Sequence, residues 1–122
     1  MKKFSLLLVL IILILTATGC RKQVFDGSRT SNEKQFILDY AILSKSMTHE
    51  MELEQGAVID VVIVNKSGQV DILVTDESGK ELYRGDNASS SEFSIEIPEK
   101  GTYKFMVIGK KAKGGVSFIL EE

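Results

Sequence analysis

The sequence has little of the chemistry on which most catalytic and metal-binding sites depend. Its 122 residues include one cysteine, one histidine and no tryptophan. A single cysteine excludes an intrachain disulfide and a zinc site built on cysteines. The chain also has no excess of positive charge, with 15 basic and 17 acidic residues, which argues against general nucleic-acid binding. With 43% hydrophobic and 26% charged residues, the composition is that of one globular domain.

The first twenty residues have the organisation of a secretory signal. A positive start at 1–3 precedes an almost unbroken apolar run at 4–15, and small residues follow at 16–19. The run is about a dozen residues long, whereas a membrane-spanning helix needs roughly 20. We therefore predict a cleaved signal peptide at 1–19.

The end of this signal carries a family resemblance. Ala17-Thr18-Gly19-Cys20 resembles the lipobox of bacterial lipoproteins, although the family prefers Leu where this chain has Ala17. The resemblance implies that Cys20 carries the lipid, becomes the mature N-terminus and holds the protein on the extracytoplasmic face of the cell membrane. An ordinary secreted protein is the alternative. Cleavage removes two lysines and changes the net charge from −2 to −4, so the anchor and not surface charge would hold the protein there.

The remainder predicts a tether and one β domain. Residues 20–34 are polar and follow neither a helical nor a strand period, which indicates a flexible tether. From 35 to 122, short β-type segments alternate with turn residues, including an expected turn at 65–68 and a hairpin tip at 109–115. The pattern predicts an all-β antiparallel sandwich, jelly-roll or Ig-like, of seven or eight short strands. The expected strands are 43–53, 58–64, 69–75, 80–84, 92–97, 102–108 and 116–120, with 35–43 as a strand or a short helix.

Two stretches of the β domain resemble known sandwich domains. Residues 70–82 resemble a D-I-x-V-x-D-x-x-G-x-x-L hairpin, and 93–105 resemble a strand, a Pro-x-x-Gly-x-Tyr turn and the next strand. Together they are similar to the bacterial pre-peptidase C-terminal (PPC-type) domain and to GOLD-like jelly-roll domains, over residues 52–120. Tyr103 also resembles a tyrosine corner, in which the hydroxyl bonds to backbone a few residues upstream.

The candidate catalytic chemistry is sparse. His49 alternates with Met47 and Met51, which predicts a core or edge histidine. A Ser-His-Asp site would need an open, paired His49, and the sequence has no Gly-x-Ser-x-Gly motif. We expect no catalytic residue and no enzyme activity. A hydrolase with an unrecognised site is a further alternative. It would require that His49→Ala abolishes turnover while the protein still folds.

Calcium is the better inorganic candidate, because it prefers oxygen ligands. Five residues lie in or beside expected turns and are candidate ligands: Asp71, Asp76, Glu77, Asp86 and Asn87. The resemblance to PPC-type and jelly-roll domains also implies calcium in such loops. The alternative is that these residues only stabilise turns through local backbone bonds.

Two charged features remain. Asp60 interrupts the apolar run 58–64, and we expect it to face solvent, lie at an edge or contact a ligand. Lys110, Lys111 and Lys113 cluster in the expected hairpin tip. They either contact phosphate-rich envelope polymer or lipid headgroups, or are simply solvated.

Together these features predict a lipid-anchored, extracytoplasmic, non-enzymatic binding or accessory module for an envelope protein. The alternative is a jelly-roll domain that binds glycan or cell-wall polymer, with calcium as a candidate cofactor. The partners expected are the membrane, through the lipid, and an envelope protein or a wall polymer.

Overall fold

The computed structural model describes residues 23–122. The predicted signal peptide and the predicted lipidation site at Cys20 lie outside the described residues. Every regular element in the described part is a β-strand, which confirms the all-β prediction. The strands are β1 (Val24–Asn32), β2 (Gln35–Ser44), β3 (Ser46–Leu53), β4 (Val58–Thr75), β5 (Glu81–Gly85), β6 (Ser91–Glu96) and β7 (Gly101–Leu120).

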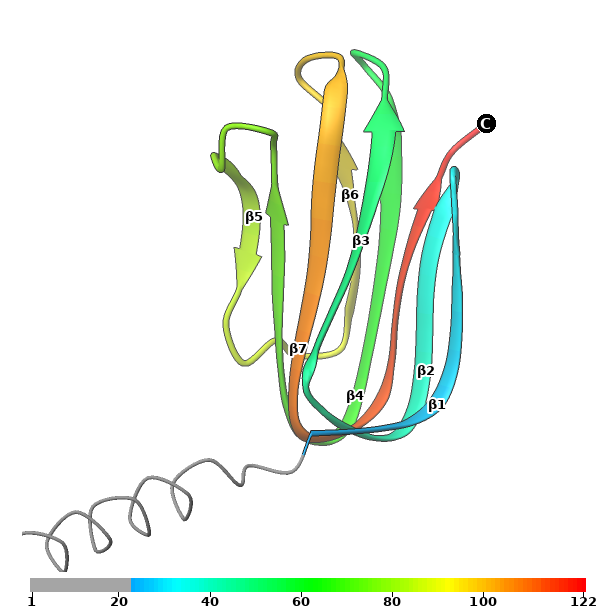
Figure 1. Cartoon of the computed structure of the whole chain (residues 1–122), viewed down its shortest axis with the longest axis vertical. Coiled ribbons are helices and arrows are strands. Elements are labelled where there is room, and N and C mark those ends of the chain that lie inside the picture. Colours follow the sequence, from blue (N-terminus) through cyan, green and yellow to red (C-terminus); the bar gives the residue numbers. More distant parts are fainter. Residues whose placement is uncertain (1–22) are drawn as a thin grey trace, which may run out of the picture.

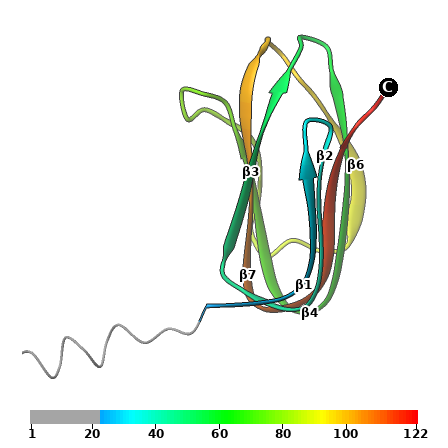
Figure 2. The ribbon, with the colours of Figure 1, turned by 45° about the vertical axis from the view of Figure 1, so that its right-hand side comes forward.

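The two longest strands, β4 and β7, organise the domain. They pair antiparallel with each other and bend together, β4 at residues 65–69 and β7 at residues 109–114, so the sheet folds over onto itself (Figure 1). One layer contains β1, β2, the second half of β7, the first half of β4, and β6. The other contains β3, the first half of β7, the second half of β4, and β5. We call these the five-stranded and the four-stranded layer, and the turned view in Figure 2 separates them.

The fold gives the domain two different ends. The bend end contains the bends of β4 and β7, the start of β1 and the short connection between β2 and β3. The loop end contains the β3–β4, β4–β5 and β6–β7 connections and the C-terminus (Figure 1).

The predicted turn at 65–68 and the predicted hairpin tip at 109–115 do mark where the chain turns, but both segments are bends inside continuous strands and not loops between separate short strands. Gly68 (φ 74°), Lys111 (φ 49°) and Gly114 (φ 141°) do adopt the positive φ values that redirect a chain. They turn each strand back at the bend end, so that its two halves lie in different layers, while β4 and β7 stay paired on both sides of the bend. The two bends therefore convert the expected short strands into two long ones.

The start of the domain also differs from the prediction. Residues 24–32, expected as part of a flexible tether, form β1, which pairs with β2 along its length. The strand is exposed from Asp26 onward, so no apolar alternation marks it in the sequence. The domain therefore begins before the predicted boundary at residue 35, and 35–44 is a strand and not a helix.

The core lies between the two layers. Phe105 of the four-stranded layer and Phe118 of the five-stranded layer have ring centroids 5.0 Å apart, and Phe36 stacks on Phe118 at 6.0 Å. Inward residues of β4 and β7 alternate with outward ones, as the strand patterns predict. Over residues 23–122, no helix has the length and apolar character that would cross a membrane.

Candidate functional site

The β4–β5 turn uses both of its acidic residues to hold backbone. Asp76 Oδ1 accepts hydrogen bonds from the N–H groups of Ser78 and Lys80, both at 2.9 Å, and from the Ser78 hydroxyl at 2.7 Å. The Ser78 hydroxyl is the main reason that the pKa of Asp76 lies below its ordinary value. Glu77 Oε1 accepts the N–H of Thr102 at 2.7 Å. Asp76 thus has the local turn-stabilising role that the sequence offered as the alternative to calcium, whereas Glu77 ties the turn to the start of β7.

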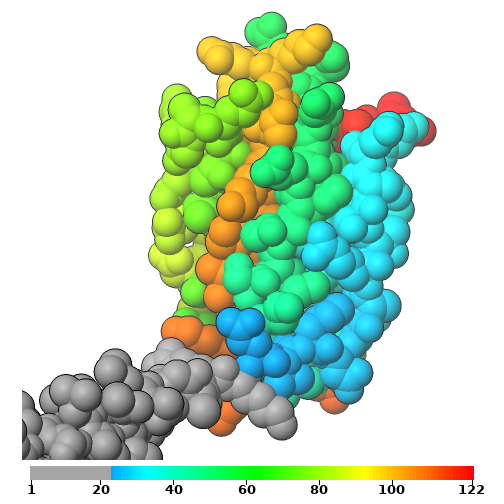
Figure 3. Space-filling model, in the orientation of Figure 1, coloured from blue at the N-terminus to red at the C-terminus, as the bar shows by residue number. Residues whose placement is uncertain are grey.

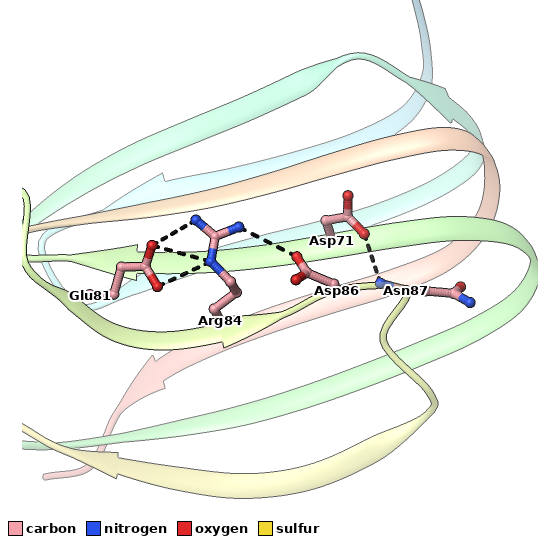
Figure 4. Close-up of polar contacts among 5 residues, drawn as sticks. All are labelled: Asp71, Glu81, Arg84, Asp86 and Asn87. Carbon is pink, nitrogen blue, oxygen red and sulfur yellow. Dashed lines mark hydrogen bonds and ion pairs between the residues drawn. The ribbon is translucent and has the colours of Figure 1, made fainter.

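The other three calcium candidates lie around the end of β5 (Figure 4). Asp71 Oδ1 accepts the N–H of Asn87 at 2.7 Å, which ties the β5–β6 connection to β4. Asp86 lies 3.4 Å from the guanidinium of Arg84, which makes a closer ion pair with Glu81 at 2.7 Å. The Arg84 hydrogen bond lowers the pKa of Glu81, and Glu81 in turn raises the pKa of Arg84.

The structure therefore divides the five candidates between two places. Asp76 and Glu77 lie in the β4–β5 turn at the loop end, whereas the others lie near the β5–β6 connection. Within residues 23–122, no three His, Cys, Asp or Glu side chains converge as a metal-ligand set. Calcium binding stays a prediction.

His49 lies at the seam where β1 and β3 bring the two layers together. Its ring is 5.4 Å from the ring of Phe36, and its Nε2 is 2.7 Å from the carbonyl oxygen of Asn32. Beside it, the Arg29 guanidinium lies 5.0 Å over the same Phe36 ring and donates to the carbonyl of Thr48 at 2.7 Å. Of the two predicted placements, core or edge, the structure shows the edge: His49 is half-buried on β3, which within the described residues pairs only with β7. Both side chains tie β1 to β3.

The tyrosine corner is confirmed. The Tyr103 hydroxyl donates to the carbonyl oxygen of Glu99 at 2.5 Å, four residues upstream, and the side chain is 3% exposed. Tyr40 is equally buried, but within the described chain its hydroxyl has no hydrogen-bond partner. Burial raises the pKa of Tyr40 to about 12. The two buried tyrosines thus differ in one contact.

An aliphatic patch lies on the outer face of the five-stranded layer. We define it as Ile37, Val62, Val64 and Ile119. Val64 and Ile119 are 42% and 39% exposed, and only Ile42 joins them as an exposed large hydrophobic residue among residues 23–122. They come from three neighbouring strands: Val62 pairs with Ser117, which pairs with Ile37 across β7.

Small residues leave a hollow beside three members of this patch, on the side toward the bend end. The hollow is about 300 Å³, and its lining includes Ile37, Val62 and Val64 and the small residues Gly115 and Ser117. Two charged residues, Asp39 and Lys66, also line it. The outer face of the four-stranded layer, whose strands β3, β5 and β7 are visible in Figure 3, differs, because its large apolar side chains are half-buried. The five-stranded layer is therefore the one with an unpartnered apolar surface.

Acidic residues border the patch. Asp60 pairs in register with Ile119 and accepts a hydrogen bond from the Ser94 hydroxyl at 3.0 Å. Glu121 lies close to Asp60, and this carboxyl neighbour raises the pKa of Glu121. Asp60 thus faces outward from an interior strand, between β7 and β6. Two like charges beside an apolar surface form an acidic border that a cation would relieve.

This patch was not predicted from the sequence. Residues 58–64 were predicted as a central strand that is apolar on both faces, and β4 is indeed flanked by β7 and β6. Only the inward face of that run is covered. A second signal was available in Ile119, which is apolar although it alternates out of phase with Phe118 and Leu120.

Comparisons with known proteins give structural likeness alone. No protein-family model matches the chain, and the comparison with curated proteins gives no match. Among solved structures, a periplasmic lysozyme inhibitor of g-type lysozyme from Aeromonas hydrophila is 12% identical, with a TM-score of 0.48 over 80% of this chain and 88% of that one. The pre-peptidase C-terminal domain of a collagenase from Bacillus anthracis is 13% identical, with a TM-score of 0.49 over 83% of this chain and 100% of that one.

A third similar structure is TmCBM61 in complex with β-1,4-galactotriose. It is 18% identical, with a TM-score of 0.41 over 77% of this chain and 68% of that one. Because all three identities are this low and all three TM-scores are below 0.5, the function is inferred below from this chain's own residues.

Proposed function

We propose that this protein is a lipid-anchored, extracytoplasmic, non-enzymatic binding module that docks onto an envelope protein through the aliphatic patch. The observation that carries the proposal is the exposure of Val64 and Ile119 on one outer face, next to a hollow of about 300 Å³ that Val64 lines. Anchoring at Cys20 is part of the proposal and comes from the lipobox resemblance.

The patch has the composition of the centre of a protein interface. Such centres are apolar and are surrounded by a polar rim that stays in contact with water. Here the centre is aliphatic, and Asp60, Ser94 and Glu121 lie on its rim. Small residues at Gly115 and Ser117 leave room for a partner's side chain in the hollow. The surface therefore suits a protein with a protruding apolar side chain.

The charge of the rim narrows the chemistry of the partner. Asp60 raises the pKa of Glu121, first through a hydrogen bond that favours the protonated carboxyl and second through charge repulsion, and a lysine or arginine placed between the two carboxylates would stabilise both in the ionised form. We therefore expect the partner surface to combine an apolar side chain with a neighbouring basic residue. Charge complementarity of this kind, between a basic residue of the partner and two carboxylates, contributes more to specificity and association rate than to affinity.

A protein partner is favoured over a glycan by the placement of the aromatic rings. Glycan sites commonly use exposed aromatic faces, whereas Phe36, Phe105, Phe118, Tyr40 and Tyr103 of this chain are buried in the core. Tyr83 and Phe93 are half-buried and pack edge to face on each other at 4.7 Å. These rings are engaged within the fold.

Site-specific photocrosslinking in the native membrane tests the proposal. A photoreactive amino acid replaces Val64 in the full-length protein, and a matched control replaces Lys104, which is exposed on the outer face of the other layer. We expect one dominant protein adduct from position 64 and none from position 104. The substitution Ile119→Glu should abolish the adduct at 64, because it replaces an apolar contact of the patch with a carboxylate that would be buried against the partner's apolar side chain.

Two outcomes would overturn the proposal. Equal adducts from both positions would mean that the patch is not a specific surface. Recovery of wall fragments with no protein adduct would instead support the glycan-binding alternative. Lipid attachment is checked separately, by mass spectrometry of the N-terminal peptide.

A further inference from the structure

Lysines gather at the bend end of the domain, on the segments that turn the chain. Lys66 lies in the bend of β4, Lys110, Lys111 and Lys113 lie in the bend of β7, and Lys45 lies between β2 and β3. We call these five the bend lysines. All except the half-buried Lys45 are exposed, and within residues 23–122 none has a carboxylate within ion-pair distance.

Backbone contacts hold these segments together. The N–H of Lys111 donates to the Ser44 hydroxyl at 2.9 Å, and the N–H of Gly109 donates to the carbonyl of Lys45 at 3.0 Å. The bend of β4 is packed so closely that a Cβ on Gly68 would lie 2.1 Å from the carbonyl oxygen of Lys111. The bend lysines therefore project from a fixed platform and not from a flexible loop.

The chain enters the domain at the same end. Val24, the first residue of β1, pairs with Ser44, whose hydroxyl accepts the N–H of Lys111. Figure 3 shows the blue start of β1 beside the orange lower part of β7. Val24 is only four positions after Cys20, and an extended chain covers at most about 14 Å in four residue steps. Two of the residues in between, Arg21 and Lys22, are themselves basic.

The opposite end has the opposite charge. Eight acidic residues lie in or beside the loops and termini of the loop end: Glu33, Glu52, Glu54, Asp76, Glu77, Glu99, Glu121 and Glu122. Four aspartates lie toward the bend end, but on strand faces or in the β5–β6 connection and not on the bends: Asp26, Asp39, Asp71 and Asp86. Of these, Asp71 accepts the Asn87 N–H and Asp86 pairs with Arg84. Although the net charge is negative, the charges are unevenly distributed: the loop end is acidic, and the bend end, where the chain enters the domain, is basic.

We infer that the bend lysines dock the domain on the anionic surface of the bilayer that holds its lipid. This inference rests on the proposed lipid attachment at Cys20. A short link keeps the bend end within about a Debye length or two of the headgroups, where each lysine strengthens association with anionic lipid roughly fivefold. The acidic loop end then faces away from the membrane, and the aliphatic patch stands on the side of the domain.

Lysine acylation of the full-length lipidated protein tests this orientation. The protein is recovered from bacterial membranes and reconstituted in phosphatidylcholine vesicles, with or without 50% phosphatidylglycerol. Acylation rates are then read by mass spectrometry. We expect Lys110, Lys111 and Lys113 to react at least fivefold more slowly on the anionic vesicles, and Lys80 and Lys100, near the loop end, to react equally on both. Molar salt should remove the difference.

Matched triple variants supply the control. The substitutions Lys66→Gln, Lys110→Gln and Lys113→Gln together should restore fast acylation of Lys111. The substitutions Lys80→Gln, Lys100→Gln and Lys104→Gln together should leave its protection unchanged. Unchanged thermal midpoints show that both variants fold.

The outcomes separate the two proposals. A protein that does not float with either vesicle lacks the anchor, which contradicts the proposed lipid attachment and the docking that rests on it. A protein that floats with both vesicles but whose bend lysines react equally on both is anchored without docking, which overturns this inference alone.

Discussion

The two ends of the sandwich turn the chain by different means. At the loop end, side chains stabilise the turns: Asp76 accepts the turn's own N–H groups, Glu77 accepts the N–H of Thr102, and Tyr103 reaches back to Glu99. At the bend end, backbone conformation redirects two paired strands at once, with positive φ at residues such as Gly68 and Gly114. The side-chain-stabilised turns of the loop end can be recognised in the sequence. The bends of β4 and β7 cannot be distinguished there from ordinary turns between separate strands.

The largest expected effect comes from a side chain added at the bend. In Gly114→Ala, a Cβ would lie 1.9 Å from the carbonyl oxygen of Val64, at a φ of 141° that residues other than glycine rarely adopt. We expect the free energy of unfolding to fall by about 3 kcal/mol or more. Urea denaturation monitored by circular dichroism measures this change.

Gly79→Ala is the matched control at the loop end. Gly79 also has a positive φ, 87°, but nothing lies within 4 Å of an added Cβ, so we expect a loss of only about 1 kcal/mol. Equal losses at the two glycines would mean that close packing of β4 against β7 does not distinguish the bend end.

The next effect is alkaline destabilisation through Tyr40. Its pKa is raised from 10.0 to about 12 in the folded protein, so the unfolded chain releases this proton first as the pH rises. The contribution of neutral Tyr40 to the free energy of unfolding is fully present below pH 10. It is lost as the pH rises to about 12, which lowers the free energy of unfolding by at most about 2 to 3 kcal/mol. Tyr40→Phe should remove this part of the pH dependence between pH 9 and pH 12. An unchanged alkaline slope in that variant would contradict the assignment to Tyr40.

The third prediction compares the two buried tyrosines at neutral pH. Tyr103→Phe removes the hydrogen bond to Glu99 and should cost about 1 kcal/mol, the net value of one such bond. Tyr40→Phe removes a hydroxyl that has no partner among the described residues, so it should leave stability unchanged or raise it. Thermal midpoints of both variants test the pair, and a larger loss at Tyr40 would reverse the comparison.

The smallest effect concerns the carboxyl pair beside the patch. Asp60 raises the pKa of Glu121, so the ionised pair lowers stability at neutral pH, and this cost disappears as the pH falls through the raised pKa. Glu121→Gln should therefore raise the thermal midpoint slightly at pH 7 and leave it unchanged at pH 3, where both forms are neutral. A lower midpoint at pH 7 would indicate that the Asp60–Glu121 contact is stabilising.

Features that depend on residues close together in the sequence could be predicted from local patterns. Alternation correctly placed Phe105 and Phe118 inward, and the Gly-x-Tyr spacing correctly predicted the bond from Tyr103. β1 could not be predicted in this way, because its residues are mostly exposed and it is held by pairing with β2 and by Arg29 against β3. The aliphatic patch was missed because apolar residues on both faces of 58–64 do not reveal which face is covered.

The continuity of β4 and β7 has a consequence for how the domain opens. Because the same two strands form the centre of both layers, neither layer keeps its central pairing if the other separates. The sandwich should therefore unfold as one cooperative unit. The amide hydrogens of Phe105 and Phe118 lie on opposite sides of the bend. Hydrogen exchange should give the same opening free energy at both amides, equal to the global free energy of unfolding.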